Sequence, residues 1–358
     1  MKILEKFKKA EKVETPVKEE KPARSQIPKK FKALLITELP GDKYSGQITE
    51  RDINELPEGE VLIRVEYSSI NFKDALSANG NKGVSRSFPH TPGVDAAGVV
   101  LSSESKSVSV GDEVIVTGYD LGMNTSGGFG QLIRVPAEWV VKCPAGLALR
   151  DSMILGTAGF TAALCIDKLI RNGVKPSSGK ILVTGATGGV GIIAVALLSK
   201  LGYQVTASTG KEEQHGMLLS IGAKEIVDRS LFADETRKPL LDEEWAGAID
   251  VVGGDTLFNV VKSLCYGGSV AACGLVQSPV FHASVLPFIL RGVNLLGIDS
   301  VKLPLSTKTA VWKKLANEWK LSNLDDISTD IGFDELESSL AQVFKGLAVG
   351  RFVLHLKT

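Results

Sequence analysis

The chain has 358 residues, 44% of them hydrophobic and 23% charged, which is an ordinary globular composition long enough for about two domains. Its 41 basic and 41 acidic residues cancel, which excludes a global electrostatic attraction to nucleic acid or to an anionic membrane. The four cysteines form no CxxC pair and there is no run of about 18 apolar residues. We therefore expect reduced thiols, a reducing compartment and no membrane span.

Residues 1–30 differ in composition from the rest of the chain. They contain ten Lys or Arg residues, five Asp or Glu residues and three prolines. Such a segment buries too little apolar surface to offset the entropy lost on ordering, so we expect a disordered charged arm. It is too acidic for a typical transit peptide and lacks the apolar core of a secretory signal. Its role, as a functional tail or a passive extension, stays open.

The next region, residues 31–152, has the sequence pattern of a compact β-rich domain. Residues 32–37 and 60–67 alternate or run apolar with β-branched side chains, which predicts strands. Glycine and proline interrupt the region often, as in the pairs at 92–93 and 127–128. Such punctuation is typical of tight turns between short strands.

The sequence pattern is different over residues 153–300, where a long helix-compatible stretch at 153–169 precedes alternating strands and helices. Six stretches resemble buried strands: 180–184, 204–208, 225–227, 248–252, 269–273 and 294–297. Residues 190–201 are apolar on nearly all sides, as expected for a helix packed on a sheet. This α/β alternation predicts a doubly wound parallel sheet with the strand count of a complete Rossmann fold.

The last region, residues 301–358, has a sequence pattern similar to that of the first domain. Residues 333–343 have a helical pattern and residues 351–356 resemble a strand. We expect the chain to go back and complete the first, β-rich domain.

The clearest chemical motif is VTGATGGVG at residues 183–191, between a predicted strand and an apolar helix. Gly188 and Gly189 let the backbone approach a pyrophosphate, and the free N–H groups and positive dipole of the helix start attract it. Thr187 and Val190 complete the predicted cofactor loop. Ala186 replaces the usual first glycine of the fingerprint, so a plain glycine-rich turn stays an alternative.

The end of the second predicted strand indicates which nicotinamide cofactor is used. Enzymes that use NAD usually place an acidic residue about 20 positions after the glycine loop, on the ribose 2′-hydroxyl. Here the chain reads Ser208-Thr209-Gly210-Lys211, with two hydroxyls, a cation and no carboxylate. A 2′-phosphate suits this set, so we predict NADPH. A solvated strand end with an ordinary surface lysine is the alternative.

Longer blocks extend the resemblance to a known family. They are NFKDAL at 71–76, GTAGFTA at 156–162, WAGAID at 245–250, YGG at 266–268, AACGL at 271–275 and PFILR at 287–291. With the glycine loop they resemble the quinone-oxidoreductase-like branch of the medium-chain dehydrogenase/reductase superfamily, and within it the acrylyl-CoA reductase group. The resemblance covers residues 31–356.

This resemblance implies a fold and an activity. The fold is a GroES-like domain built from both ends of the chain, with a Rossmann domain inserted. The activity is reduction of acrylyl-CoA, an enoyl-CoA, to propanoyl-CoA with NADPH, in a cytoplasmic homodimer. Two further functions stay open, namely a quinone or activated-alkene reductase and a non-enzymatic protein that retains NADPH.

The family motifs depart from the zinc-dependent pattern. Zinc-dependent relatives carry Gly-His-Glu where this chain has Gly93-Val94-Asp95, and the region of the cysteine ligand reads Asn71-Phe72. A four-cysteine structural lobe is also missing. Since zinc is held by thiolate and imidazole ligands, we predict that no metal is bound.

The block at 71–76 supplies the candidate catalytic residues. Close relatives often have tyrosine at Phe72, which here can form a wall of the nicotinamide site but cannot donate a proton. Asn71 could hold the ribose or a substrate oxygen, Lys73 could support developing negative charge, and Asp74 could orient its neighbours. Helix capping by Asn71 or Asp74 is the alternative, and water stays open as the proton donor.

Four more residues are expected near the cofactor. Leu275, Ile298 and Ser300 follow late strands, where a doubly wound sheet binds its ligand, although packing roles are equally open. Arg351 resembles a family position that reaches the cofactor, and an ordinary surface arginine is its alternative.

Overall fold

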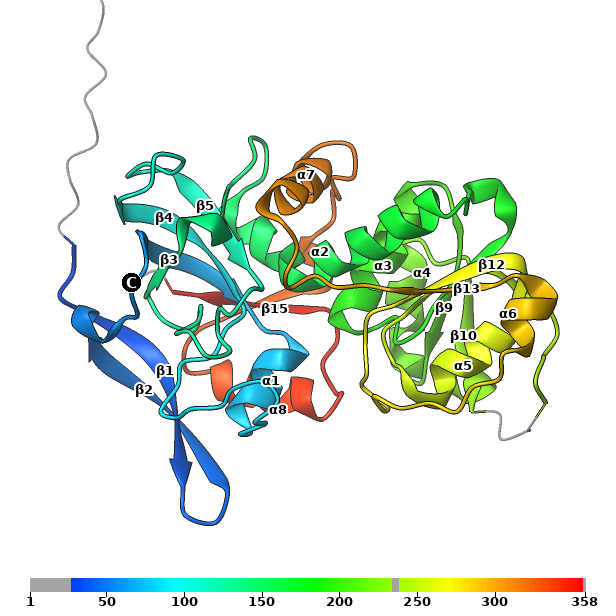
Figure 1. The fold of residues 1–358 in the computed structure, drawn as a ribbon, viewed down its shortest axis with the longest axis horizontal. Coiled ribbons are helices and arrows are strands. Elements are labelled where there is room, and N and C mark those ends of the chain that lie inside the picture. Colours follow the sequence, from blue (N-terminus) through cyan, green and yellow to red (C-terminus); the bar gives the residue numbers. More distant parts are fainter. Residues whose placement is uncertain (1–26, 234–237, 357–358) are drawn as a thin grey trace, which may run out of the picture.

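The structure, a computed structural model, describes residues 27–233 and 238–356. Most of the predicted charged arm therefore lies outside the described residues. Figure 1 shows a β-rich part and an α/β part side by side, with helix α2 (Leu149–Arg171) running where they meet.

The α/β part is built on a six-stranded parallel sheet in the order β10-β9-β8-β11-β12-β13. The strands are β8 (Lys180–Val183), β9 (Gln204–Thr209), β10 (Glu225–Asp228), β11 (Trp245–Asp250), β12 (Leu264–Ala272) and β13 (Asn294–Gly297). In chain order this is the 3-2-1-4-5-6 arrangement of the Rossmann fold. All six predicted strands are present, which confirms the predicted fold class. The helices between them are α3 (Gly189–Lys200), α4 (His215–Ser220), α5 (Gly254–Lys262) and α6 (Leu286–Arg291).

The β-rich part combines both ends of the described chain in one sheet of order β14-β15-β3-β4-β5-β7, with β6 paired to β3. Its strands are β3 (Val61–Ser69), β4 (Asp95–Ser103), β5 (Glu113–Thr117), β6 (Leu132–Val135), β7 (Val140–Lys142), β14 (Ser328–Ile331) and β15 (Arg351–His355). Strand β15 lies antiparallel to β3, so the end of the chain does return to the first region. A separate hairpin is formed by β1 (Lys30–Leu39) and β2 (Lys43–Asp52).

Three further helices belong to the β-rich part or pack between the two parts. They are α1 (Phe72–Ala78), α7 (Leu305–Ala316) and α8 (Leu336–Phe344). Helix α8 corresponds to the helix expected at 333–343 and packs on α1, whereas α7, which packs on α2 and β7, was not predicted. Short 3₁₀ helices lie at Ile53–Glu55, Ala137–Trp139, Pro176–Ser178, Glu212–Gln214, Arg229–Phe232 and Asp325–Ile327.

Helix α2 joins the two parts and is bent at Gly156, where φ is 50° and ψ is −156°. A Cβ at this position would collide with Ser69 Oγ and lie 2.6 Å from Asp95 Oδ2, so only glycine lets the helix approach strand β4 so closely. The helix is long and apolar enough to cross a membrane, but 72% of its apolar window is buried inside the protein. It is the central helix of a shared core, contacting α3, β3, β4 and β12.

Candidate active site

The glycine loop lies between β8 and α3, at the carboxyl edge of the parallel sheet. Gly188 is the N-cap residue of α3 and has no side chain to cover the free N–H groups of the first turn. Thr187 is buried, and its carbonyl accepts a hydrogen bond from Gly350 N at 2.9 Å. Strand β15 of the β-rich part therefore begins directly beside the loop that is predicted to hold phosphate.

Arg351, the first residue of β15, is only 3% exposed, so the surface-arginine alternative does not describe it. Its Nε donates to Ile154 O at 2.9 Å, and its Nη1 donates to Ile70 O at 3.0 Å. A Cβ on Gly189 would lie 2.8 Å from Nη1, which places the guanidinium against the glycine loop. Nη2 is buried without a hydrogen-bond partner in the described part of the chain. The positive charge of this buried guanidinium, next to the loop, favours a pyrophosphate there.

Asp95 organises the junction from the first position of β4. Its Oδ2 accepts hydrogen bonds from Ser69 Oγ (2.7 Å) and Asn71 Nδ2 (2.7 Å). Thr157, just past the bend in α2, donates through its N–H to Oδ2 (2.8 Å) and through Oγ1 to Oδ1 (2.6 Å). Asn71 Oδ1 in turn faces Arg351 Nη1 at 3.4 Å. We call Ser69, Asn71, Asp95, Thr157 and Arg351 the junction network.

Asp74 is fully buried, and both of its carboxylate oxygens are engaged by the backbone. Oδ2 accepts from Asn71 N at 2.8 Å, and Oδ1 accepts from Gly93 N and Val94 N at 3.2 and 2.8 Å. Burial raises the pKa of Asp74 to about 7, and the Asp95 charge adds to the increase. These contacts match the capping alternative for Asp74, which fixes the start of α1 and so the position of Asn71.

Phe72 and Lys73 form the first turn of α1, and both are half-buried. No described residue accepts a hydrogen bond from the Lys73 amine, so its charge faces no fixed partner. Ile298 and Ser300 follow β13 at the carboxyl edge of the sheet and are half-buried, while Leu275 follows β12 and is 51% exposed. The structure thus brings Ile298, Ser300 and the glycine loop to one edge of the sheet, as expected for a ligand site.

The end of β9 carries the residues predicted to select the cofactor. Ser208 and Thr209 are buried, and Thr209 Oγ1 accepts from Lys211 N at 3.1 Å, so their hydroxyls are less accessible than the sequence suggests. Lys211 Nζ donates to Ala348 O at 2.7 Å. Burial lowers the pKa of Lys211, the charge of Glu213 opposes this decrease, and the charge of Arg229 adds to it.

Arg229, which follows β10, was missed by the sequence analysis. A Cβ on Gly210 would lie 2.6 Å from its Nε, so the guanidinium lies across Gly210, next to Lys211. Two neighbouring cations with no described carboxylate paired to Arg229 form a ready anion site. The available signal was its place directly after a predicted strand, because ligands bind beyond the carboxyl ends of such strands.

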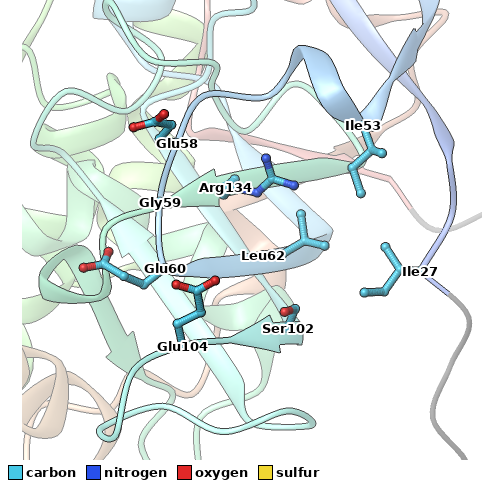
Figure 2. A pocket seen from close by; sticks show the side chains of 9 residues that line it. All are labelled: Ile27, Ile53, Glu58, Gly59, Glu60, Leu62, Ser102, Glu104 and Arg134. Atoms are coloured by element: carbon cyan, nitrogen blue, oxygen red, sulfur yellow. The ribbon is translucent and has the colours of Figure 1, made fainter.

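A hollow of about 560 Å³ lies elsewhere, on the outer side of the β-rich part (Figure 2). Glu58, Glu60 and Glu104 line it together with Arg134, as Figure 2 shows. None of the residues predicted for catalysis or cofactor binding takes part in it. Its carboxylates would repel a phosphate-bearing ligand, so we do not assign it to the active site.

Comparisons with known proteins agree with this geometry. A family described as "Alcohol dehydrogenase GroES-like domain" matches residues 57–145, and one described as "Zinc-binding dehydrogenase" matches residues 189–317. The acrylyl-CoA reductase AcuI of Ruegeria pomeroyi is 41% identical over 90% of this chain and 98% of its own length. The chain belongs to the medium-chain dehydrogenase/reductase superfamily.

Two more members of the superfamily are similar to this chain. The putative quinone oxidoreductase YhfP of Bacillus subtilis is 42% identical over 91% of this chain and 99% of its own length. The crystal structure of the yhdH oxidoreductase from Salmonella enterica, in complex with NADP, has a TM-score of 0.88 and 41% identity, covering 91% of this chain and all of that one. These comparisons confirm the resemblance to quinone-oxidoreductase-like and acrylyl-CoA reductase members.

The name of the second matched family raises the question of zinc, and the side chains at the corresponding place do not fit that metal. Val94 offers no donor atom, and the carboxylate of Asp95 is occupied by donors from Ser69, Asn71 and Thr157. Among the residues that the structure describes, no three His, Cys, Asp or Glu side chains gather to hold a metal ion. We therefore derive no step of the reaction from a metal.

Proposed function

We propose that this protein is an NADPH-dependent reductase of the carbon–carbon double bond of acrylyl-CoA, which it converts to propanoyl-CoA without a metal. The substrate is assigned from the 41% identity to the Ruegeria pomeroyi acrylyl-CoA reductase over nearly the whole of both chains. The cofactor is assigned from the two cations Lys211 and Arg229 beside Gly210, where the 2′-phosphate of NADPH would lie.

The chain offers a complete set of groups for NADPH. The free backbone N–H groups of Gly189 and Val190 in the first turn of α3, next to the buried charge of Arg351, would hold the pyrophosphate. Phe72, Ile298 and Ser300 would surround the nicotinamide. When bound there, NADPH supplies the hydride that the β-carbon of the substrate receives.

The remaining chemistry falls to side chains at the junction. Asn71 is locked by α1 and by its two amide N–H donors, which bind Asp95 Oδ2 and Ser69 O, so its Oδ1 is the atom that would accept a hydrogen bond from a hydroxyl of the cofactor ribose. The unpaired ammonium of Lys73 supports the negative charge that the thioester oxygen gains. Asp74 acts by positioning Asn71, and water supplies the proton to the α-carbon.

The substrate can be tested by a panel that follows the loss of NADPH absorbance with acrylyl-CoA, crotonyl-CoA and a quinone. We expect the highest kcat/KM with acrylyl-CoA, and unchanged activity after dialysis against a chelator. Turnover of the quinone alone would replace our proposal with a quinone reductase, a candidate favoured by the 42% identity to YhfP. NADPH binding without any turnover would indicate a non-enzymatic role.

We also propose a cytoplasmic homodimer. Strand β13 is an edge of the parallel sheet, and the neighbouring segment exposes Val280, Val285, Ile289 and Leu290, each by more than half of its surface. A second copy of this chain would cover these apolar side chains. Ile289→Asp should yield a monomer in sedimentation, and a dimeric variant would refute this surface.

A further inference from the structure

Lys308 is an unusual buried cation on α7. It is 0% exposed, and its ammonium donates a hydrogen bond to Thr117 O at the end of β5. The ammonium also lies 3.8 Å from the ring centroid of Tyr119. No carboxylate in the described part of the chain forms an ion pair with it. Burial of an ammonium without an anion is costly, so its retention calls for a functional explanation.

The residues around Lys308 hold it at the junction of the two parts. A Cβ on Gly118 would lie 3.1 Å from Lys308 Nζ and 3.2 Å from Ser300 O. Lys308 is therefore close to the segment after β13 that we assign to the nicotinamide end of the site. Gly118 N also donates to Val94 O, which ties this turn to the residue before Asp95.

Tyr119, which covers the ammonium, has a strained backbone with φ of 53°. Its ring stacks on Trp139 at 5.5 Å with an interplanar angle of 8°, and its hydroxyl donates to Leu303 O at 3.0 Å. A non-glycine residue persists in this conformation only where its surroundings fix it, and such strain concentrates at functional sites.

Burial and three nearby charged groups determine the charge state of Lys308. Burial lowers the pKa of Lys308 to about 8, Asp95 on β4 and Asp299 after β13 oppose this decrease, and Lys73 on α1 adds to it. Tyr119 is the other titratable group in contact, and burial raises its pKa, so it stays neutral. Lys308 is thus mainly charged at pH 7 and mainly neutral above pH 8.

We propose that Lys308 supplies a fixed positive charge that stabilises the negative charge of the thioester oxygen during reduction. The inference rests on the proposed function. In that reaction the hydride bonds to the β-carbon, and the electron pair of the double bond moves onto the thioester oxygen. The pair then returns to the α-carbon as that atom takes a proton from water. Lys308 acts through its field and exchanges no proton with the substrate.

The charge requirement predicts a pH dependence. Above pH 8 the lysine loses its proton and kcat of the wild type should fall. Lys308→Arg keeps the charge at every pH used, so its kcat should stay level from pH 7 to about 9.5. Lys308→Met removes the charge but keeps the chain length, and we expect kcat about tenfold to a hundredfold lower than that of the wild type at pH 7.

Measurements of thermal stability and of NADPH affinity distinguish this electrostatic role of Lys308 from a structural role. Replacing an uncompensated buried charge with an apolar side chain is neutral or stabilising, so the Tm of Lys308→Met should equal or exceed that of the wild type. Its Kd for NADPH should stay within about twofold of that of the wild type. Lys313, exposed on the same helix, provides the matched control Lys313→Met, which should change none of these quantities.

The experiment measures kcat and KM for acrylyl-CoA from pH 6 to 10, the Kd for NADPH and the Tm for the four proteins. A ¹³C NMR titration of labelled lysine, assigned by the signal missing in Lys308→Arg, should give a pKa near 8 for Lys308. Undiminished kcat in Lys308→Met, or a kcat loss accompanied by a lower Tm and weaker NADPH binding, would overturn the inference. A wild type that does not reduce acrylyl-CoA would instead refute the proposed function, and this inference with it.

Discussion

The nucleotide edge of the α/β part and the junction with the β-rich part are built in different ways. The glycine loop and residues 208–211 each come from one short stretch of chain. The junction network draws Asn71, Asp95, Thr157 and Arg351 from four distant segments, tied together by buried hydrogen bonds. A site formed by contiguous residues can be recognised from a motif, whereas a site assembled by packing becomes visible only in three dimensions.

The most damaging change to the junction should be Arg351→Met. It removes a buried cation that interacts with the charges of Asp95 and Asp74 and the three hydrogen bonds that this guanidinium donates, so we expect the free energy of unfolding to fall by about 3–5 kcal/mol. The affinity for NADPH should fall more than tenfold, because the buried positive charge beside the glycine loop is lost. Urea denaturation and a binding titration measure the two effects. Arg171→Met, which changes an exposed arginine on α2, should alter neither, and a fully stable Arg351→Met would contradict the network.

The sequence predicted the regular parts of the fold well. The six strands of the parallel sheet were found because apolar runs alternate with helical periodicity, and the strand at 294–297 has the predicted bounds. The bend in α2 was missed because Gly156 stands within a continuous apolar pattern that predicts a straight helix. Helix α7 was missed because its first turn is polar, and Lys308 is buried against the usual preference of lysine for solvent.

The candidate site was predicted less evenly. The loop at 187–190 and Lys211 were recognisable from local motifs. Arg229 could not be paired with Lys211, because the two residues meet only when β9 and β10 align. Asp95 was noticed only as a departure from a zinc motif, and two of the four hydrogen bonds to its carboxylate come from Thr157, next to the bend in α2.

Gly156→Ala tests that bend directly. The alanine must adopt a positive φ and also displace Ser69 and Asp95, so the free energy of unfolding should fall by more than the roughly 1 kcal/mol expected for backbone strain alone. Gly173→Ala is the matched control, since Gly173 has φ of 88° but no atom within 4 Å of the added Cβ. Equal losses in the two variants would show that the close approach to Asp95 contributes nothing.

Lys211→Ala and Arg229→Ala test the nucleotide edge. Each should weaken NADPH binding by about tenfold to a hundredfold, because a charge-assisted hydrogen bond to the 2′-phosphate is lost. NADH binding should change little, and added salt should weaken NADPH binding more than NADH binding. Binding titrations of NADPH and NADH against the wild type and each variant measure these effects, and Lys175→Ala, at an exposed lysine, is the control. A wild type that prefers NADH would reject the assignment of this edge.

Phe72→Tyr should have the smallest effect. Phe72 is half-buried in the first turn of α1, and we place its ring against the nicotinamide, where a hydroxyl can be accommodated. We expect kcat and the Kd for NADPH to stay within about threefold of the wild-type values, a change of less than 1 kcal/mol. Loss of NADPH binding in this variant would mean that Phe72 lies elsewhere in the site.

The central claim is that the two regions cooperate to reduce an enoyl thioester with NADPH. It is tested most directly by mass spectrometry of the product formed from acrylyl-CoA and unlabelled NADPH in heavy water. We expect propanoyl-CoA with one deuterium, on the α-carbon, and one molecule of NADPH consumed per product. Consumption of NADPH without deuterated propanoyl-CoA, or turnover of a quinone in its place, would contradict the account.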